Sequence, residues 1–339
     1  MHYYIFTLGC QMNIYDSQKI EQYLDSNGCK SASEDEADLI IINACSVRQK
    51  AVDRIYGHLK KWQGKKIFIT GCILPHDKKK LENKVEFFSD IQDLKKILNK
   101  IFPKSKTDSR LLKAESQSEA FVPIMTGCDN FCSYCAVPYT RGPEISRPEK
   151  DIIAEFKKLV TNGAKRIILL GQNVNNFKPS FVDLLRKIIN IPGDFKIGFL
   201  TSNPWNFPEE LVELVANEPK ILKEIHLPLQ SGDDEILRKM NRHYTAAQYL
   251  KLVNNLRFAI SDLRLSTDII VGFPGEIKKA FENTIKLCKK AKFNKAYIAM
   301  YSPRPGTSSP KKYRDNVPRE EKKRRFQILD NLINPKTKP

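Results

Sequence analysis

The sequence predicts an α/β protein in which a small N-terminal parallel α/β domain is followed by a partial (β/α)6 barrel. Apolar runs of strand length alternate with segments of helical character along the whole chain, which is the pattern of parallel α/β folds. A polar stretch at 103–118 separates an early group of these units from a later one and is expected to be a linker. We therefore place the domains at 1–118, with the linker included, and at 119–334.

The first domain is expected to contain three buried strands separated by helices. Gly28 is a helix stop signal, and Asp16 or Ser17 is a candidate N-cap for the helix that ends at Asn27. A basic helix is expected over 46–63. The predicted strands are 3–8, 37–43 and 67–70.

The second domain is expected to contain six strand–helix units. The predicted strands are 121–126, 166–170, 195–200, 221–227, 263–271 and 295–301, and the predicted helices are 148–162, 180–190, 208–217, 245–260, 277–291 and 318–333. Six such units over about 200 residues fit an incomplete parallel barrel, whose active site lies at the carboxyl ends of its strands.

The charge balance indicates a polyanionic partner, because 57 Lys and Arg residues outnumber 39 Asp and Glu residues for a net charge of +18. Solvated lysine-rich faces are the alternative explanation. The chain has no apolar run long enough to cross a membrane, and its N-terminus does not have the form of a signal peptide. We therefore expect a cytoplasmic protein without membrane contact, in which the eight cysteines are metal ligands or free thiols.

Three cysteines with the spacing C-x₃-C-x₂-C form the most informative motif of the chain, and we call Cys128, Cys132 and Cys135 the loop set. Cys thiolates hold iron–sulfur clusters, usually four to a cube. Three ligands in one loop leave one iron open to bind something else. A zinc site that borrows a distant fourth ligand is the alternative, since structural zinc has four protein ligands.

A second group of three cysteines is expected to assemble from distant parts of the first domain. Cys10, Cys45 and Cys72, which we call the strand-end set, each follow an apolar strand and a small residue. The carboxyl ends of parallel strands lie at one edge, so these thiols are expected to meet there as ligands. Buried free cysteines are the alternative. Cys29 and Cys288 fit neither set and are expected to be ordinary thiols.

The loop set at the end of the first barrel strand resembles the cluster motif of the radical S-adenosylmethionine (SAM) enzymes. The resemblance implies that Cys128, Cys132 and Cys135 bind a 4Fe–4S cluster, and that SAM chelates the open iron. By the same resemblance Tyr134 occupies the usual aromatic position beside the adenine, with an ordinary packing role as the alternative. The further residues expected to bind the cofactor lie at strand ends and are Gly171, Gln172, Asn173 and Gly272.

Within that superfamily the chain resembles the methylthiotransferases over nearly its whole length. Three stretches look like the N-terminal cysteine motifs of that family: residues 7–13 with Asp16 and Ser17, residues 43–51, and residues 71–72. The match implies a second 4Fe–4S cluster on the strand-end set. The segments that resemble the branch acting on isopentenylated adenosine in tRNA are 171–175, 226–232 and 240–242 with Tyr244 and Thr245.

The resemblance implies that the enzyme adds a methylthio group to carbon 2 of N(6)-isopentenyladenosine next to the anticodon. This carbon is unactivated, so radical chemistry from SAM and the clusters is expected and no protein side chain is a catalytic base. The expected partners are the tRNA anticodon loop, an electron donor such as flavodoxin or ferredoxin, and a sulfur source that the sequence does not identify. Arg141, Arg147, Arg242 and Arg304 are candidate contacts to phosphate or bases, with surface salt bridges as the alternative.

Two groups of alternatives remain open at this point. The same reaction could act on threonylcarbamoyladenosine in tRNA or on a ribosomal protein, or the chain could be a non-catalytic iron–sulfur RNA-binding protein. Methylthiotransferases normally carry a C-terminal RNA-binding TRAM domain, and this sequence stops about where that domain should begin. We therefore expect no TRAM domain within these 339 residues.

Overall fold

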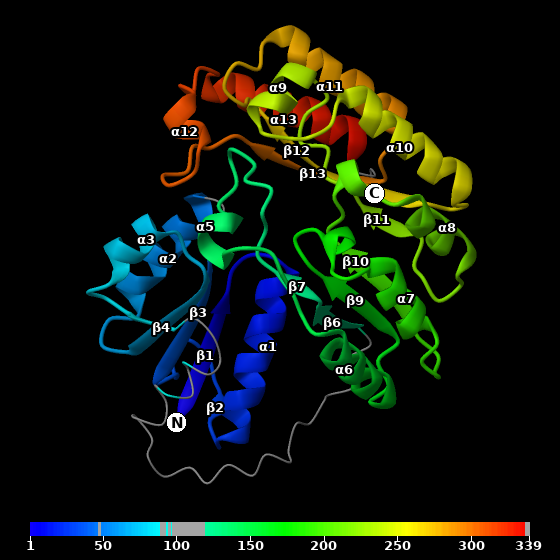
Figure 1. The fold of residues 1–339 in the computed structure, drawn as a ribbon. Coiled ribbons are helices and arrows are strands. Elements are labelled where there is room, and N and C mark those ends of the chain that lie inside the picture. The colour runs from blue at the N-terminus through cyan, green and yellow to red at the C-terminus, as the bar shows by residue number, and fades with distance from the viewer. Residues whose placement is uncertain (47–48, 89–92, 94–95, 97–118, 336–339) are drawn as a thin grey trace. The chain divides into compact units, whose positions relative to one another are not determined.

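The computed structural model describes residues 1–46, 49–88, 93, 96 and 119–335, which form two compact units (Figure 1). The first unit contains the described residues up to 96 together with Ala136–Gly142 and Arg304–Gly306. The second contains the remaining described residues of 119–335. The predicted linker and the boundary at residue 118 lie outside the described residues.

The first unit is built on a five-stranded parallel sheet with the strand order β2-β1-β3-β4-β5. Its strands are β1 (His2–Thr7), β2 (Lys30–Ser31), β3 (Leu39–Cys45), β4 (Lys66–Cys72) and β5 (Glu86–Phe87), and its helices are α1 (Gln11–Ser26), α2 (Gln49–Lys61), α3 (Pro75–Leu81) and α5 (Val137–Arg141). The three strands that the sequence predicted are therefore the central ones.

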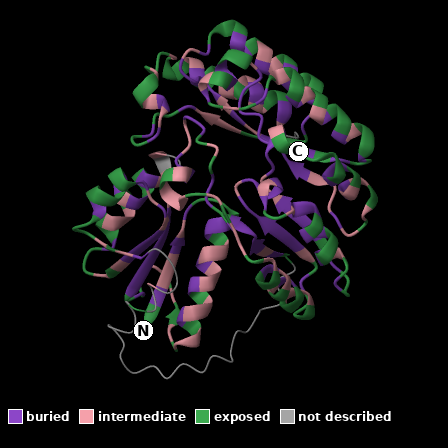
Figure 2. Ribbon diagram, viewed as in Figure 1, coloured by how far each residue is buried: buried purple, intermediate pink, exposed green. Residues whose placement is uncertain are grey.

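Apolar residues bury both faces of this sheet, as Figure 2 shows in purple for β3. On one face, Ile40 and Ile42 pack in a cluster with Ile55 and Trp62 from α2 and the residue that follows it. On the other face, Leu39 and Ile41 pack in a cluster that includes Ile20 and Leu24 of α1. A strand covered on both sides needs a continuous apolar run, and Leu-Ile-Ile-Ile supplies it.

The predicted start of the first helix was wrong, because α1 begins at Gln11, directly after the N-cap Cys10, and not near Asp16. Asp16 and Ser17 lie inside the helix, where their side chains have partners other than the helix terminus. Ser17 Oγ is 2.7 Å from Thr7 Oγ1 and accepts a hydrogen bond from Asn43 Nδ2 at 2.9 Å. The polar residues therefore fasten the helix to the strand ends instead of capping it.

The second unit contains six parallel strands in the order in which they occur along the chain. They are β6 (Glu119–Pro123), β9 (Arg166–Leu170), β10 (Lys196–Leu200), β11 (Glu224–His226), β12 (Arg264–Val271) and β13 (Lys295–Met300), with the short pair β7 (Met125–Thr126) and β8 (Ile145–Ser146). The helices are α6 (Glu149–Thr161), α7 (Phe181–Ile189), α8 (Glu209–Asn217), α9 (Asp234–Lys239), α10 (Ala246–Ala259), α11 (Lys278–Ala291), α12 (Ser309–Lys312) and α13 (Arg319–Ile333), with 3₁₀ turns at Val174–Asn176 and Pro204–Asn206.

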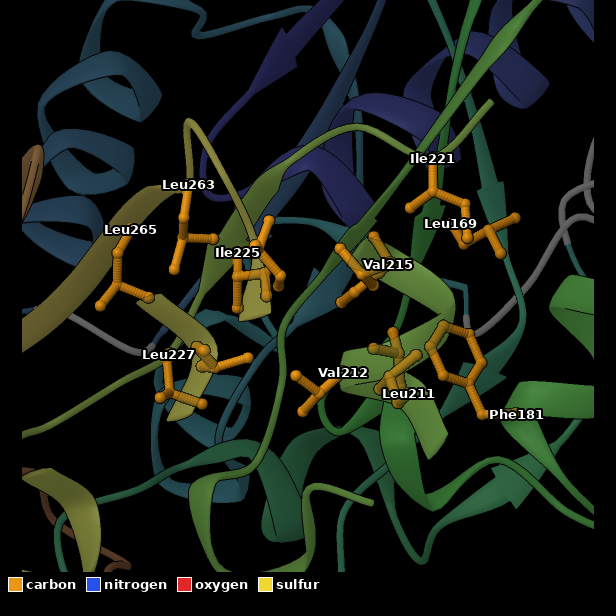
Figure 3. Packing of buried hydrophobic residues seen from close by; sticks show 14 of the residues in the cluster. Leu169, Phe181, Leu211, Val212, Val215, Ile221, Ile225, Leu227, Leu263 and Leu265 are labelled. Atoms are coloured by element: carbon orange, nitrogen blue, oxygen red, sulfur yellow. The ribbon is translucent and has the colours of Figure 1, made fainter. Parts of the chain in front are cut away.

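These strands form an open barrel wall. Two three-stranded sheets, β10-β9-β6 and β11-β12-β13, are joined by a parallel bridge between Ile197 and Ile221. Among the described residues no pairing joins β6 to β13, so the wall remains open. Strand and helix residues such as Leu169, Leu265 and Leu211 pack in one apolar core between the wall and its helices (Figure 3). The predicted partial barrel is confirmed.

The sequence missed the short helices α3, α5, α9 and α12, which have between four and seven residues each. Such helices are too short to show apolar periodicity; α3, α5 and α12 have a proline in their first turn, and α9 has a side-chain cap. The Asp233 side chain accepts a hydrogen bond from the Ile236 amide at the start of α9. In the part of the chain that the structure describes, no helix combines the length and hydrophobicity that crossing a bilayer requires.

Candidate functional site

The strand-end set lies at the carboxyl edge of the first unit's sheet. Cys45 and Cys72 are direct partners in the β3–β4 register. Thr7 pairs with Asn43 at the end of β1, and a methyl group added to Gly9 would lie 3.1 Å from Cys45 Cβ. Cys10 follows Gly9, so the three cysteines come from three neighbouring strand ends, as the sequence predicted.

Two asparagines and a glycine fix this edge. The fully buried Asn13 donates from Nδ2 to Asn43 Oδ1 at 2.8 Å and to the Ala44 carbonyl at 3.0 Å. Asn43 Nδ2 returns a 2.6 Å hydrogen bond to the Asn13 carbonyl. Gly71 has φ of +94°, and an added Cβ would lie 2.4 Å from the Ala44 carbonyl oxygen. A side chain at Gly71 would therefore displace the strand ends that carry Cys45 and Cys72.

A guanidinium group contacts the strand-end set. Arg141 Nε donates to Cys72 Sγ at 2.8 Å, and Nη2 lies 3.2 Å from Asp16 Oδ2. Burial raises the pKa of Cys72 to about 11; Arg141 opposes this shift, and neighbouring Cys45 and Cys10 add to it. Burial also raises the pKa of Asp16, again against the effect of Arg141. Burial disfavours the thiolate form of Cys72, and Arg141 is the neighbouring group that favours it.

The loop set lies in the second unit, after β7, where polar side chains from two other segments hold it. Cys128 and Cys132 are each 9% exposed. Asn173, which follows β9, donates from Nδ2 to Cys128 Sγ at 3.2 Å. Arg242 Nη1 donates to Cys132 Sγ at 3.4 Å. Both thiols therefore receive N–H donors from side chains distant in sequence.

The residues that follow α9 fix the conformation of the loop itself. Asn241 Nδ2 donates to the Asn130 and Phe131 carbonyls, each at 3.1 Å. The Ser133 amide donates to the Met240 carbonyl at 3.0 Å. Phe131 has φ of +46°, so the backbone between the first two cysteines is in the left-handed region. These contacts hold a conformation that the loop sequence alone does not favour.

Arg242 is surrounded by aromatic rings as well as by the thiol. Its guanidinium carbon lies 4.7 Å from the Trp205 ring centroid and 5.1 Å from that of Tyr244. Burial by itself would lower the pKa of Arg242, but nearby Tyr244, Tyr134 and Cys132 raise it well above its ordinary value. The side chain therefore stays cationic beside the loop set.

A cluster of polar side chains lies on the face of the β11–β13 sheet opposite the helices. Residues of β12 alternate, with Leu265, Ile269 and Val271 in the core and Ser266 and Asp268 on the other face. His226 Nδ1 is 2.9 Å from Ser266 Oγ, and Nε2 is 3.1 Å from Asp268 Oδ2. The Tyr297 ring, 53% exposed, packs edge-on against His226 at 5.8 Å. We call His226, Ser266, Asp268 and Tyr297 the inner polar layer.

Two family models match the chain, and together they cover most of both units. Residues 122–288 match the radical SAM superfamily, and residues 2–91 match a family described as Uncharacterized protein family UPF0004.

Close relatives extend over almost the whole chain. The tRNA-2-methylthio-N(6)-dimethylallyladenosine synthase of Endomicrobium trichonymphae is 39% identical over 348 residues, which cover 97% of this chain and 83% of that protein. The protein of the same name from Carboxydothermus hydrogenoformans is 40% identical over 367 residues, covering 98% and 83%. The chain belongs to this synthase family. Its sequence-based recognition as a radical SAM methylthiotransferase is thereby confirmed.

Solved structures agree on the fold. The radical SAM methyltransferase TsrM from Kitasatospora setae, with cobalamin and a [4Fe–4S] cluster bound, gives a TM-score of 0.59 at 12% identity over 88% of this chain and 74% of that one. The cobalamin-dependent radical SAM enzyme OxsB gives 0.57 at 12% identity over 99% and 55%. The synthase family is therefore a radical SAM enzyme family in fold as well as in sequence.

The donor chemistry of the loop set fits the cofactors that radical SAM membership implies, namely SAM and a 4Fe–4S cluster. Thiolates are the ligands of such clusters, and N–H donors to the sulfurs tune them. Cys128 and Cys132 receive such donors from Asn173 and Arg242. No three His, Cys, Asp or Glu side chains surround a single metal-ion position anywhere in the described ranges.

The structure brings some of the expected SAM contacts close to the loop set. Asn173 is bonded to Cys128, and Tyr134 packs on a cluster that contains Met240, Phe273 and Tyr301. The amides of the two glycines already have partners. Gly171 donates to the Leu200 carbonyl at 2.7 Å, and Gly272 donates to the Glu276 carboxylate. Gln172 is half-buried.

The four candidate arginines are bound within the protein. Arg141 and Arg242 contact thiols, whereas Arg147 donates to the Pro123 carbonyl at 2.5 Å and to Glu155 at 2.8 Å. Arg304 is 3% exposed and forms a 2.6 Å ion pair with Asp77. The interpretation of Arg304 as an RNA contact was therefore wrong, because its buried guanidinium already neutralises a buried carboxylate.

The two remaining cysteines lie in apolar surroundings. Cys29 packs against the cluster of Leu24 and Leu39, and Cys288 lies in the main core of the second unit. The sequence missed Asn13, Asp16 and the inner polar layer as parts of the sites. Asn13 and Asp16 stand in the first cysteine motif, and their separation of three along a helix places them on one face.

Proposed function

We propose that the chain transfers a methylthio group to carbon 2 of N(6)-isopentenyladenosine next to the anticodon of tRNA. The observation that carries this proposal is the presence of two separate three-cysteine sets, each in contact with a guanidinium donor, in a chain of the synthase family. Sulfur insertion at an unactivated carbon needs both a radical source and a place for the added sulfur. Two sets of thiol ligands can provide one of each.

Each set would hold one 4Fe–4S cluster. Cys128, Cys132 and Cys135 would bind the first and leave one iron open to SAM, and Cys10, Cys45 and Cys72 would bind the second. When bound, the clusters and SAM supply the one-electron and sulfur chemistry.

The chain's own residues position these groups. Asn173 and Arg242 direct N–H groups at the loop set, while Asn13, Asn43 and Gly71 fix the strand-end set. Low exposure of Cys128 and Cys132 limits access of water. We propose no side chain as a catalytic acid or base.

We further propose that SAM contacts the residues singled out from the sequence. Tyr134 would lie beside the adenine, and the side chains of Gln172 and Asn173 would offer polar contacts. Gly171 and Gly272 would allow close approach through their missing side chains, because their amides have internal partners.

The inner polar layer is our candidate for contact with the substrate nucleoside. Asp268, held by His226, offers a carboxylate acceptor for base edges, and Tyr297 offers an exposed ring for stacking. A loop base can leave its stack to reach such a surface, and the net charge of +18 favours the tRNA backbone. The enzyme would act on tRNA in the cytoplasm, with a flavodoxin or ferredoxin as its electron donor.

The domain division at residue 118 belongs to the same proposal. The two family models end at 91 and begin at 122, which supports a boundary between these positions. Threonylcarbamoyladenosine and a ribosomal protein are the rival substrates, and the names of the relatives support the isopentenylated base instead.

The direct test is complementation. A deletion strain that lacks its own synthase receives this chain, and its tRNA nucleosides are analysed by mass spectrometry. The 2-methylthio form of isopentenyladenosine is expected to appear. Unmodified isopentenyladenosine from a chain that binds iron normally would contradict the proposal, and the Cys132→Ala variant is the negative control.

A further inference from the structure

The strand-end set receives a cation from a segment that lies far from it in the sequence. Arg141 is the last residue of α5, in the segment Ala136–Gly142 that belongs to the first unit. Its side chain is 12% exposed, and Nε lies 2.8 Å from Cys72 Sγ. A guanidinium held at this distance by a thiol is placed to stabilise negative charge on the sulfur.

The same guanidinium is tied to a second cysteine through Asn13. Arg141 Nη2 lies 3.4 Å from Asn13 Oδ1, and Cys10 Sγ lies 3.5 Å from the same oxygen. The same Arg141 nitrogen, Nη2, also lies 3.2 Å from Asp16 Oδ2. The guanidinium therefore contacts Cys72 directly and is linked to Cys10 through Asn13, so Arg141 is the cation that these contacts bring to the set.

We propose that Arg141 is a positioning residue of the strand-end set, which holds the Cys72 sulfur and raises the reduction potential of the iron–sulfur cluster bound there. This inference rests on the proposed second cluster. Reduction adds an electron to a cluster already surrounded by thiolates. A nearby positive charge and an N–H donor to sulfur both favour the reduced form.

A purely structural role is the competing explanation. In that case the pair of Arg141 with Asp16 would only dock α5 on α1, and removing either member would have the same effect. The two residues carry opposite charges, however, so their effects on a reduction potential should have opposite signs. The sign of each shift therefore separates the two explanations.

The test uses the full-length chain with the loop set replaced by alanine (Cys128→Ala, Cys132→Ala, Cys135→Ala). Only a cluster on the strand-end set can then form on anaerobic reconstitution. Its midpoint potential is measured by redox titration with electron paramagnetic resonance, in this background and with Arg141→Gln, Arg141→Lys, Asp16→Asn or Arg147→Gln added. Arg147 is the matched control, since it is bound to Glu155 and the Pro123 carbonyl.

We expect Arg141→Gln to shift the equilibrium about tenfold toward the oxidised cluster, which is about 59 mV to more negative potential for one electron. Arg141→Lys should recover part of this shift, Asp16→Asn should move the potential in the positive direction, and Arg147→Gln should leave it unchanged. If the glutamine variant binds no iron, the lysine variant is expected to bind it at an intermediate potential.

Three results would overturn the inference. An unchanged midpoint potential in Arg141→Gln, with normal iron content, would overturn this inference but not the proposed second cluster. Equal negative shifts in Arg141→Gln and Asp16→Asn would show that the pair has only a docking role. Absence of iron from the background itself would overturn the proposed second cluster, and this inference with it.

Discussion

Cys128, Cys132 and Cys135 lie within one loop, whereas Cys10, Cys45 and Cys72 reach their common edge from three strands. The spacing of its cysteines predicts the loop set as a ligand group, but side chains from distant segments hold the conformation of the loop. No local spacing predicts the strand-end set, but the register of the sheet brings its three strand ends together. Both nevertheless have one arginine bonded to one thiol. Two different backbone arrangements therefore give a cysteine sulfur in each set similar surroundings.

If both sets are cluster sites of equal importance, removing one ligand from either should abolish methylthiolation. Cys72→Ala and Cys132→Ala are each expected to lower product formation by at least about a thousandfold, because cluster chemistry has no side-chain substitute. Nucleoside mass spectrometry of tRNA from complemented cells measures this effect. Cys29→Ser is the control and should retain activity. Substantial product from Cys72→Ala alone would break the equivalence of the two sets.

The strand-end set depends on backbone geometry that a single methyl group can disturb. Gly71→Ala is expected to destabilise the first unit by about 3 kcal/mol or more, since φ of +94° and a 2.4 Å contact with the Ala44 carbonyl both oppose a side chain. Gly28→Ala is the matched control, because φ is +77° but nothing lies within 4 Å of the added carbon. Gly28→Ala should lower the free energy of unfolding by only about 1 kcal/mol. Urea denaturation of the two variants measures the difference, and equal losses would contradict the packing argument.

The inner polar layer is a feature of the second unit alone. Asp268→Asn is expected to raise KM for tRNA about tenfold while both clusters remain, since a hydrogen bond to a charged group contributes about 1.5–3 kcal/mol. Steady-state kinetics with iron analysis of the same sample tests this. An unchanged KM would remove Asp268 from the substrate contacts.

The cysteines outside both sets should behave as packing residues. Burial raises the pKa of Cys288 to about 12 from an ordinary value of 9.0. The folded chain then holds a proton that the unfolded chain loses, so stability falls as pH rises between these values. The slope contributed by Cys288 is about 1.4 kcal/mol per pH unit.

Cys288→Ala should therefore flatten the alkaline loss of stability and leave the iron content unchanged. Denaturation of the two proteins at a series of pH values gives the slopes. A loss of iron in this variant would contradict its assignment to the core.

Local signals in the sequence predicted much of the fold. The apolar run at 37–43 predicted a buried strand, and Gly28 marked the end of α1. The start of α1 could not be predicted in this way, because Asp16 and Ser17 are typical capping residues. Their actual partners, Arg141 and Asn43, are brought by folding.

The same limit applies to the sites. The positions of the six cysteines follow from a motif and from strand ends, so the sequence predicted both sets. The roles of Arg141 and Arg242 depend on contacts 69 and 110 residues away in the chain. From the sequence they were indistinguishable from Arg304, which is buried on Asp77. A basic side chain in a motif does not reveal whether its partner is a thiol, a carboxylate or a phosphate.

The most direct test of the two-set account is iron and sulfide analysis after anaerobic reconstitution. It compares the unaltered chain with a variant that lacks the loop set and one that lacks the strand-end set. Two cubes require about eight irons in the unaltered chain and about four in each variant. About four irons in the unaltered chain, with no loss on replacing Cys10, Cys45 and Cys72, would contradict the two-set account.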